Sequence, residues 1–269
     1  MCELLGLSAA TPVSVSLSLA RLAEHGAESG AYPDGWGIAY YEQRDVRLLK
    51  GAEPAGASDL FRFIEEHCFR STRVIAHTRH AMRGPVAFEN TQPFARELGG
   101  RAHVFAHNGL LDEAGLRGLP FGRSLPMGDT DSEVAFCVLL GRLEPLWRSG
   151  EVPPLDERSA LVAAFAKEIR ALGPANFLYA DGDALFAHGD RRCHLGEAAP
   201  RPPGLHVLHR TCPPAPSDMR GGGVELRTQS ARHVTLFASV PLTEEPWKSL
   251  PQGQLVVAKG GRIVARLSP

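Results

Sequence analysis

The sequence predicts an α+β fold in which antiparallel sheets pack against each other. Short segments rich in Val, Ile, Phe and Tyr outnumber segments with helical spacing, and several of them form hairpin-like pairs. Asp-Gly at 181–182 and Gly-Gly at 260–261 each lie between two such runs, and these dipeptides are typical of tight hairpin turns. The regular β-α-β alternation of a parallel sheet is not seen.

Strand-like segments are expected along most of the chain. In chain order they cover 35–42, 44–50, 73–79, 102–108, 175–189, 204–209, 233–239 and 253–267.

Helical spacing is found at 13–25, 57–68, 129–146 and 156–172. The third of these segments opens with Asp129 and Thr130, which are capping candidates, and the fourth ends just before Gly173. The segment 190–226 is dense in Pro, Gly and Arg and predicts a long surface loop. Because no internal repeat or domain boundary is evident, residues 1–269 are interpreted as one domain.

The composition of the 269 residues is that of a globular protein, with 43% hydrophobic and 22% charged residues. No apolar stretch approaches the roughly 18 residues of a membrane span. The net charge of −1 argues against a nucleic-acid partner. Five widely spaced cysteines fit a reducing compartment, and no signal peptide is recognised at the start, so we expect a cytoplasmic location.

Cys2 directly follows the initiator methionine. Removal of Met1 would leave a cysteine that carries both a thiol and a free α-amine. The α-amine has a pKa of roughly 7.7 to 8.0, so it can accept the thiol proton near neutral pH. Taken alone, however, a cysteine at position 2 is better explained as a tolerated residue.

Two later segments add candidate binding groups. Arg79 ends an apolar strand, where its guanidinium could bind a carboxylate with two hydrogen bonds or form an ordinary salt bridge. Asn108 and Gly109 offer a side-chain amide and an unhindered backbone N–H, the donors of an oxyanion hole, but they could also form a simple turn. Asp129 and Asp131 begin a helix, where at least one is expected to be the N-cap and one could bind a ligand ammonium.

The order of these motifs resembles the class II (N-terminal nucleophile) glutamine amidotransferases, in the stand-alone branch without a synthase domain. The motifs are the Met-Cys start, "PDGWGIAYY", "HTR", "NTQPF", "GRAHVFAHNG" and "TDSE", and residues 238–264 also resemble the C-terminal part of that branch. The resemblance implies the N-terminal nucleophile hydrolase fold, a four-layer αββα sandwich of two antiparallel sheets.

The resemblance also implies a role for each candidate. Cys2 would attack the γ-carbonyl of a glutaminyl group to give a thioester, with Asn108 and Gly109 binding the oxyanion. Arg79 would bind the substrate α-carboxylate and Asp131 the α-ammonium. No cofactor is implied, and the substrate is glutamine or a γ-glutamyl compound.

Two further residues are candidates for the substrate pocket. Trp36 could line the pocket or pack in the core. His80 stands where synthase-linked members have Trp, and Met82 and Arg83 also depart from their pattern. These differences put free glutamine in doubt as the natural substrate and are compatible with a γ-glutamyl amide whose leaving group is larger than ammonia.

The remaining polar residues of these motifs are given structural roles. Asn90, Thr91 and Gln92 in "NTQPF" are interpreted as a turn ordered by Pro93. No metal site is expected from His77, His80 and His107, because no further ligand lies at metal-type spacing.

We therefore expect a hydrolase that acts on a γ-glutamyl group. Two alternatives stay open: an ammonia-donating subunit that works with a synthase-like protein partner, and a sensor that binds a γ-glutamyl ligand without turnover.

Overall fold

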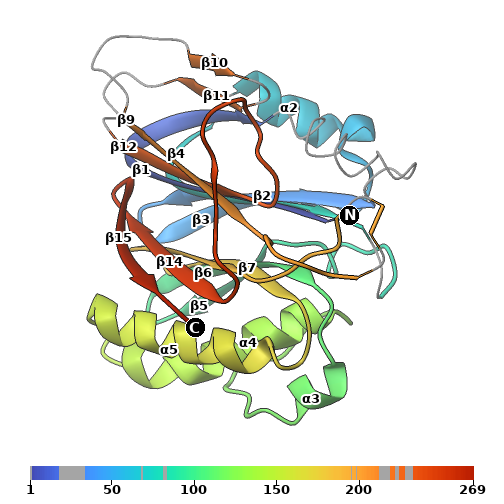
Figure 1. The fold of residues 1–269 in the computed structure, drawn as a ribbon, viewed down its shortest axis with the longest axis vertical. Helices are drawn as coiled ribbons and strands as arrows, with labels where there is room; N and C mark the ends of the chain where they lie inside the picture. The colour runs from blue at the N-terminus through green and yellow to red at the C-terminus, as the bar shows by residue number, and fades with distance from the viewer. Residues whose placement is uncertain are drawn as a thin grey trace.

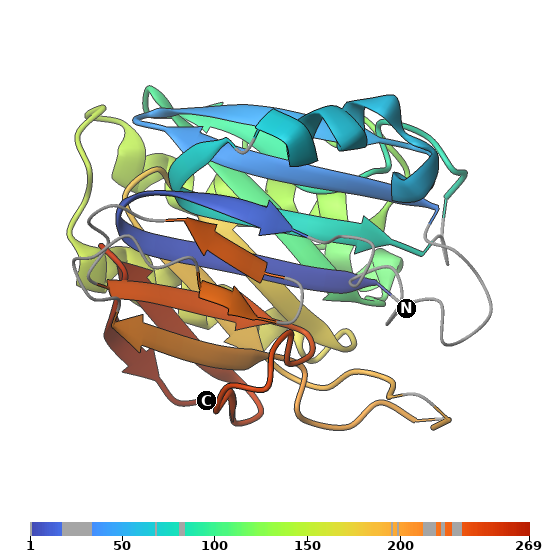
Figure 2. The same ribbon diagram turned by 90° about the horizontal axis from the view of Figure 1, so that it is seen from above.

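A computed structural model describes residues 2–17, 34–67, 69–80, 84–194, 196–197, 199–211, 219–221, 224–227 and 233–269. Within these residues the chain forms two antiparallel β-sheets stacked face to face, with helices on the two outer faces (Figure 1 and Figure 2). The α+β class and the αββα order of layers expected above are confirmed.

The first sheet has β1 in its centre. Its main strand order is β13-β9-β12-β1-β4-β2-β3, and β11 pairs with both β1 and β10. β1 is therefore hydrogen-bonded to an antiparallel strand on each side, β4 and β12. The strands of this sheet are β1 Glu3–Leu17, β2 Gly35–Glu42, β3 Asp45–Gly51, β4 Arg70–Arg79, β9 His206–Thr211, β10 Met219–Gly221, β11 Val224–Arg227, β12 His233–Ala238 and β13 Lys248–Ser249.

The second sheet has the order β15-β14-β8-β7-β6-β5. Both predicted hairpins lie in it: β7 and β8 are joined across Asp-Gly, and β14 and β15 across Gly-Gly. Its strands are β5 Phe94–Leu98, β6 Arg101–Gly109, β7 Ala175–Ala180, β8 Leu185–Gly189, β14 Gln254–Lys259 and β15 Arg262–Leu267.

The helices form the outer layers. The helix α2 (Asp59–His67) follows the 3-10 turn η1 (Ala55–Ala57) and covers the first sheet, while α4 (Asp131–Trp147) and α5 (Leu155–Ile169) cover the second (Figure 1). The short α3 (Glu113–Arg117) precedes α4. None of the described helices is long and apolar enough to cross a membrane.

The alternation of side chains along each strand separates three apolar cores. Leu5 and Leu7 of β1 face outward and pack in the layer that contains Phe61 of α2, whereas Leu4 faces the space between the sheets. On β6, Val104 lies in the same inter-sheet core as Leu4. Residues of even number at the start of β1 and along β6 therefore face each other across the two sheets.

Two sequence expectations are corrected. The helix expected at 13–25 is wrong for its first residues, because β1 continues to Leu17, and residues 18–25 lie outside the described part. The run Val13-Ser-Val-Ser-Leu17 alternates with period two, which is the pattern of a strand. The segment 190–226 is not one surface loop: it contains β9, β10 and β11, and Arg192 within it is 5% exposed.

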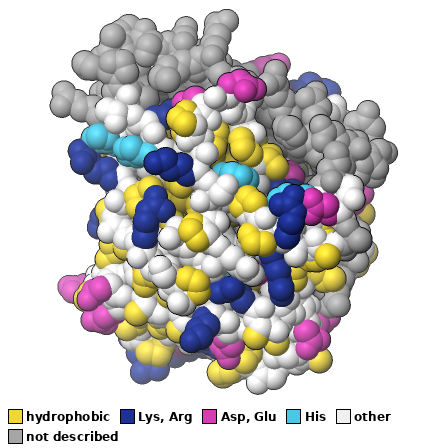
Figure 3. Space-filling view, viewed as in Figure 1, with side chains coloured by type: hydrophobic (Ala, Val, Ile, Leu, Met, Phe, Trp, Pro, Cys, Tyr) yellow, Lys and Arg dark blue, Asp and Glu magenta, His cyan; other side chains and the backbone are white. Residues whose placement is uncertain are grey.

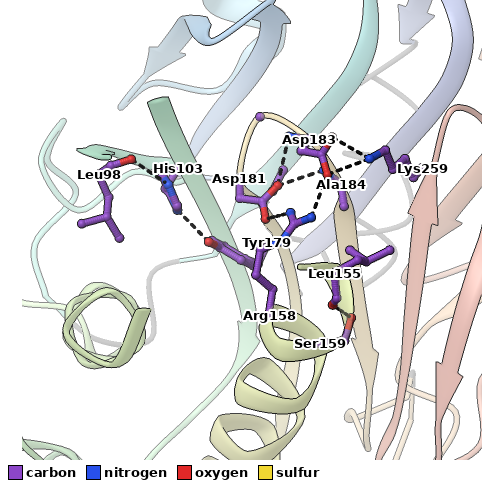
Figure 4. A network of polar contacts seen from close by, with 12 residues as sticks. Leu98, His103, Leu155, Arg158, Ser159, Tyr179, Asp181, Asp183, Ala184 and Lys259 are labelled. Atoms are coloured by element: carbon purple, nitrogen blue, oxygen red, sulfur yellow. Dashed lines mark hydrogen bonds and ion pairs between the residues drawn. The ribbon is translucent and has the colours of Figure 1, made fainter. Parts of the chain in front are cut away.

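A buried ionic network fastens the turn between β7 and β8 to its neighbours (Figure 4). Arg158 of α5 donates to Asp181 Oδ2 at 2.5 Å and to Asp183 Oδ2 at 2.8 Å, and Lys259 of β14 also pairs with Asp183. Arg73 of β4 donates to the Asp183 carbonyl at 2.8 Å, which ties the turn to the first sheet.

Charged side chains are distributed over the surface without a basic stripe on the face drawn in Figure 3. Lys and Arg side chains of the described residues are scattered there among hydrophobic and acidic ones. This distribution agrees with the net charge of −1.

His77, His103 and His188 are among the buried histidines of the two sheets. Nδ1 of His103 lies 2.6 Å from the Tyr179 hydroxyl, and Nδ1 of His188 lies 2.6 Å from the Ala175 carbonyl oxygen. Burial lowers the pKa of His103 to about 4 and that of His188 to about 4. Burial also lowers the pKa of His77 to about 3. All three are therefore neutral in the folded protein at neutral pH.

We expect the protein to lose stability when the pH falls from 7.5 to 5.5. Because the pKa of each histidine is lower in the folded than in the unfolded chain, the unfolded chain binds more protons below about pH 6.5. Each histidine should cost about 1.4 kcal/mol per pH unit below that point. Urea unfolding at the two pH values measures the loss, and His188→Gln should reduce it by about 1.4 kcal/mol. A free energy of unfolding that does not change with pH would contradict this.

Candidate functional site

Cys2 directly precedes the central strand β1 and lies beside the end of β4. The backbone N–H of His80 donates to Cys2 Sγ at 3.1 Å, and Sγ lies 3.4 Å from the His80 carbonyl oxygen. The pairing of Glu3 with Thr78 places Cys2 next to Arg79 in the continued register. The thiol is thus bound by the backbone of His80, the residue that follows the predicted substrate-binding residue Arg79.

The surroundings of Cys2 act on its thiol in two directions. Burial raises the pKa of the Cys2 thiol, whereas the His80 N–H and the positive charge of Arg79 lower the pKa. Because burial is the larger effect, the thiol is mainly protonated at neutral pH. A nearby base is needed to generate the thiolate.

Arg79 is the last residue of β4 and is 3% exposed. Its Nη2 lies within hydrogen-bond distance of the Gly84 carbonyl oxygen, at 3.4 Å. Burial lowers the pKa of Arg79, and the Cys2 and Asp34 charges act against this effect. Arg79 therefore places a positive charge that acts on the Cys2 thiol.

Asn108 brings the second sheet to Cys2. It shares the inter-sheet face of β6 with Val104, and its Nδ2 donates to the Cys2 carbonyl oxygen at 2.6 Å. The next residue, Gly109, has no room for a side chain, because a Cβ there would lie 1.8 Å from the Pro174 carbonyl oxygen. The Asn-Gly pair is thus part of a strand and not the simple turn considered as the alternative.

Asp131 supports the segment that follows Gly109. Its Oδ2 accepts a hydrogen bond from Leu111 N at 2.7 Å, and the residue is 5% exposed. The expectation that Asp129 or Asp131 is the N-cap is wrong, because the Thr130 hydroxyl accepts from Glu133 N at 3.3 Å. Asp131 is the first residue of α4 instead.

The "NTQPF" stretch has the structural role that was expected. Gln92 exchanges two hydrogen bonds with the His107 backbone, its Oε1 accepting at 2.6 Å and its Nε2 donating at 3.1 Å. Asn90 Oδ1 accepts from Asp129 N at 2.8 Å. These contacts attach the stretch to β6 and to the approach to α4.

Trp36 does not lie where a pocket side chain was expected, and His80 meets Cys2 through its backbone. Trp36 is fully buried in the outer core, with its ring 5.2 Å from that of Phe61, on the face of the first sheet opposite to Cys2. This position supports the alternative of core packing. His80 contacts Cys2 through its backbone, a contact that any residue except proline could make through its N–H.

Two buried histidines, His107 and His77, lie near the site. Nδ1 of His107 lies 2.9 Å from the Ser132 hydroxyl and its Nε2 lies 3.2 Å from the Pro174 carbonyl oxygen. His77 is fully buried in β4. In the described part of the chain no three His, Cys, Asp or Glu residues are grouped to hold a metal ion.

Three residues that contact Asn108 or adjoin Cys2 were not predicted from the sequence: Asn176, Arg192 and Glu3. Asn176 Nδ2 donates to the Asn108 carbonyl oxygen at 3.0 Å, and Arg192 Nη2 donates to Glu3 Oε1 at 2.6 Å. The available signal was a polar residue within an apolar strand, both in "ANFLYA" and in "CELLG". Arg192 gave no such signal, because it stands in a segment with many arginines.

Known proteins resemble this chain along its whole length. The whole chain, residues 1–269, matches the model of the class-II glutamine amidotransferases. The Escherichia coli (strain K12) protein YafJ, whose glutamine amidotransferase name is provisional, is 35% identical over 272 residues, which cover 98% of this chain and 100% of YafJ.

Solved structures show the same fold. The 2.0 Å crystal structure of a predicted glutamine amidotransferase from Pseudomonas aeruginosa PA01 is 31% identical with a TM-score of 0.70, covering 98% of this chain and 100% of that one. The glutamine phosphoribosylpyrophosphate amidotransferase of Bacillus subtilis has a TM-score of 0.57 at 16% identity, over 99% of this chain and 49% of that one. At this identity the second likeness concerns the fold alone.

We expect Cys2 in the form that retains Met1 to react slowly with iodoacetamide at pH 7.5. The partly buried thiol has a raised pKa, whereas Cys193 is exposed and serves as an internal reference. Peptide mass mapping over time should show Cys193 alkylated at least several-fold faster, with the difference decreasing at pH 10. Equal rates at pH 7.5 would contradict the burial described above.

Proposed function

Because the chain belongs to the class II glutamine amidotransferase family, we propose that it hydrolyses the γ-amide bond of glutamine or of a γ-glutamyl conjugate, with Cys2 as the nucleophile. The observation that carries this proposal is the 2.6 Å contact from Asn108 Nδ2 to the Cys2 carbonyl oxygen. It brings an amide donor, a buried arginine and a thiol to the meeting point of the two sheets.

The reaction begins with removal of Met1, which frees the α-amine of Cys2. The α-amine accepts the thiol proton, directly or through one water, and Sγ attacks the γ-carbonyl carbon. Asn108 Nδ2 and Gly109 N–H stabilise the negative oxygen of the tetrahedral intermediate. The leaving amine takes the proton as the C–N bond breaks, and water then hydrolyses the thioester to release glutamate and regenerate the thiol.

The zwitterionic head of the substrate needs one fixed cation and one fixed anion. Arg79 supplies the cation next to Cys2, and two parallel hydrogen bonds to the α-carboxylate suit its geometry. Asp131 supplies the anion from the start of α4. Its Oδ2 accepts a hydrogen bond from the Leu111 N–H.

A γ-glutamyl conjugate with a leaving group larger than ammonia is one of the two proposed substrate classes, and glutamine is the other. The support for the conjugate is the departure of His80, Met82 and Arg83 from the synthase-linked pattern, of which Met82 and Arg83 lie outside the described residues. The proposal places the reaction in the cytoplasm, where a free thiol remains reduced.

A glutamine-like diazoketone tests whether Cys2 is the nucleophile. Intact mass should show loss of Met1 and one covalent adduct, and peptide mapping should place this adduct on Cys2. Cys2→Ala should give no adduct, and Arg79→Lys should slow labelling at low reagent concentration. Retention of Met1 together with no adduct on Cys2 would refute the proposal. Turnover by Cys2→Ala equal to wild type would refute it as well.

Asn108→Ala should separate catalysis from binding. Loss of one oxyanion donor typically lowers kcat by about 10² to 10³-fold, because the donor stabilises the transition state more than the bound substrate. KM should change much less. In contrast, Arg79→Lys should raise KM, because a lysine cannot make two parallel hydrogen bonds to a carboxylate. Glutamate release from a panel of γ-glutamyl amides measures both, and an unchanged kcat in Asn108→Ala would contradict the oxyanion role.

The same panel separates the alternatives. A glutaminase subunit would cleave glutamine faster in the presence of a co-purifying synthase-like protein. A sensor would bind γ-glutamyl compounds without releasing glutamate.

A further inference from the structure

We propose that the three-residue segment Asp190–Arg192, which follows β8, sets the position of Cys2 relative to Asn108, with Arg192 and Asn176 as its positioning residues. The inference rests on the proposed function, since it gives these residues a part in aligning the nucleophile with the oxyanion donor.

One end of the segment holds the nucleophile strand. Arg192 Nη1 donates to Glu3 Oε2 at 3.1 Å and Nη2 donates to Glu3 Oε1 at 2.6 Å. The side chains of Arg192 and Glu3 are 4% and 1% exposed, so the pair is shielded from water. Two parallel bonds fix both the distance and the orientation of Glu3, and therefore of the adjacent Cys2.

The other end of the segment holds the strand of Asn108. Asn176 Nδ2 donates to the Asn108 carbonyl oxygen at 3.0 Å and to the Arg191 carbonyl oxygen at 2.8 Å. Asn176 Oδ1 accepts from Asp190 N at 2.7 Å. Both N–H groups of the amide are thus used, and the side chain links β6 to the segment.

The space around Asn176 is tightly filled. The residue is fully buried, and a Cβ at Gly204 would lie 1.6 Å from Asn176 Oδ1. The chain that continues from the segment therefore closes over the amide.

Together these contacts form a path from Cys2 through Glu3, Arg192, the segment and Asn176 to Asn108. A buried ion pair is weak evidence for stability by itself, because desolvation offsets much of its attraction. Its two-pronged geometry is better suited to fixing a position. Neither Arg192 nor Asn176 is proposed to exchange a proton or to touch the substrate.

Arg192→Gln is the main test, and Arg158→Gln is its matched control. Both changes remove the arginine of a buried ion pair, but Arg158 binds the turn between β7 and β8, at the end of β7 away from Asn176. Thermal melts establish a temperature at which both variants are folded. There, Arg192→Gln should lower kcat at least ten-fold with KM within three-fold of wild type, and Arg158→Gln should leave kcat within two-fold.

A second readout does not depend on turnover. If Arg192 holds the start of β1, its loss should expose the thiol, and iodoacetamide should alkylate Cys2 at least five-fold faster than in wild type and in Arg158→Gln. Equal kcat and equal Cys2 alkylation in the two folded variants would overturn the inference. A wild type without γ-glutamyl hydrolysis would instead refute the proposed function, while the alkylation rates still decide whether Arg192 positions Cys2.

Asn176→Asp serves if Arg192→Gln fails to fold. It keeps the size of the side chain but loses the two N–H donors to Asn108 and Arg191. It should lower kcat at least ten-fold with KM little changed, and should not change the rate of Cys2 alkylation. A kcat equal to that of wild type would contradict the positioning of Asn108.

Discussion

The hydrogen bond between Asn108 and the Cys2 carbonyl joins the two sheets at the ends of β6 and β1, and the candidate site depends on it. Each strand supplies chemistry that the other lacks: β1 the thiol and β6 the amide donor. The contact requires the inner faces of the sheets to be in register, which the packing of Leu4 and Val104 in one inter-sheet core provides. The packing of the inter-sheet core therefore also determines the geometry of the site.

Close approach of backbones is the second requirement. At Gly109 a Cβ would meet the Pro174 carbonyl oxygen at 1.8 Å, and at Gly37 it would meet the Gln92 carbonyl oxygen at 2.3 Å. Because these glycines lack a side chain, the backbones of Pro174 and Gln92 can approach them closely. Gln92 then binds the His107 backbone with its side-chain amide and thereby extends the order of β6 toward Asn108.

The sequence predicted the features that depend on local patterns of residues. Period-two runs and hairpin dipeptides predicted β2 and both hairpins of the second sheet, and the motif order brought Cys2, Arg79 and Asn108 to the same region. Prediction from the sequence failed for residues whose surroundings are formed by segments far away in the sequence. Trp36 looked equally suited to a pocket or a core, and only the position of α2 decides between them. Arg192 could not be distinguished from its neighbouring arginines, because its partner lies 189 residues away.

The pairing of β1 has a consequence for when the thiol becomes organised during synthesis. β12, which completes one side of β1, ends at Ala238, and Leu4 N binds the Ser239 hydroxyl at a separation of 235 residues. The first residues to leave the ribosome therefore wait for nearly the whole chain before their strand is enclosed. During that interval the amino end is accessible to peptidases, and a truncated product would carry Cys2 without the two strands that enclose β1.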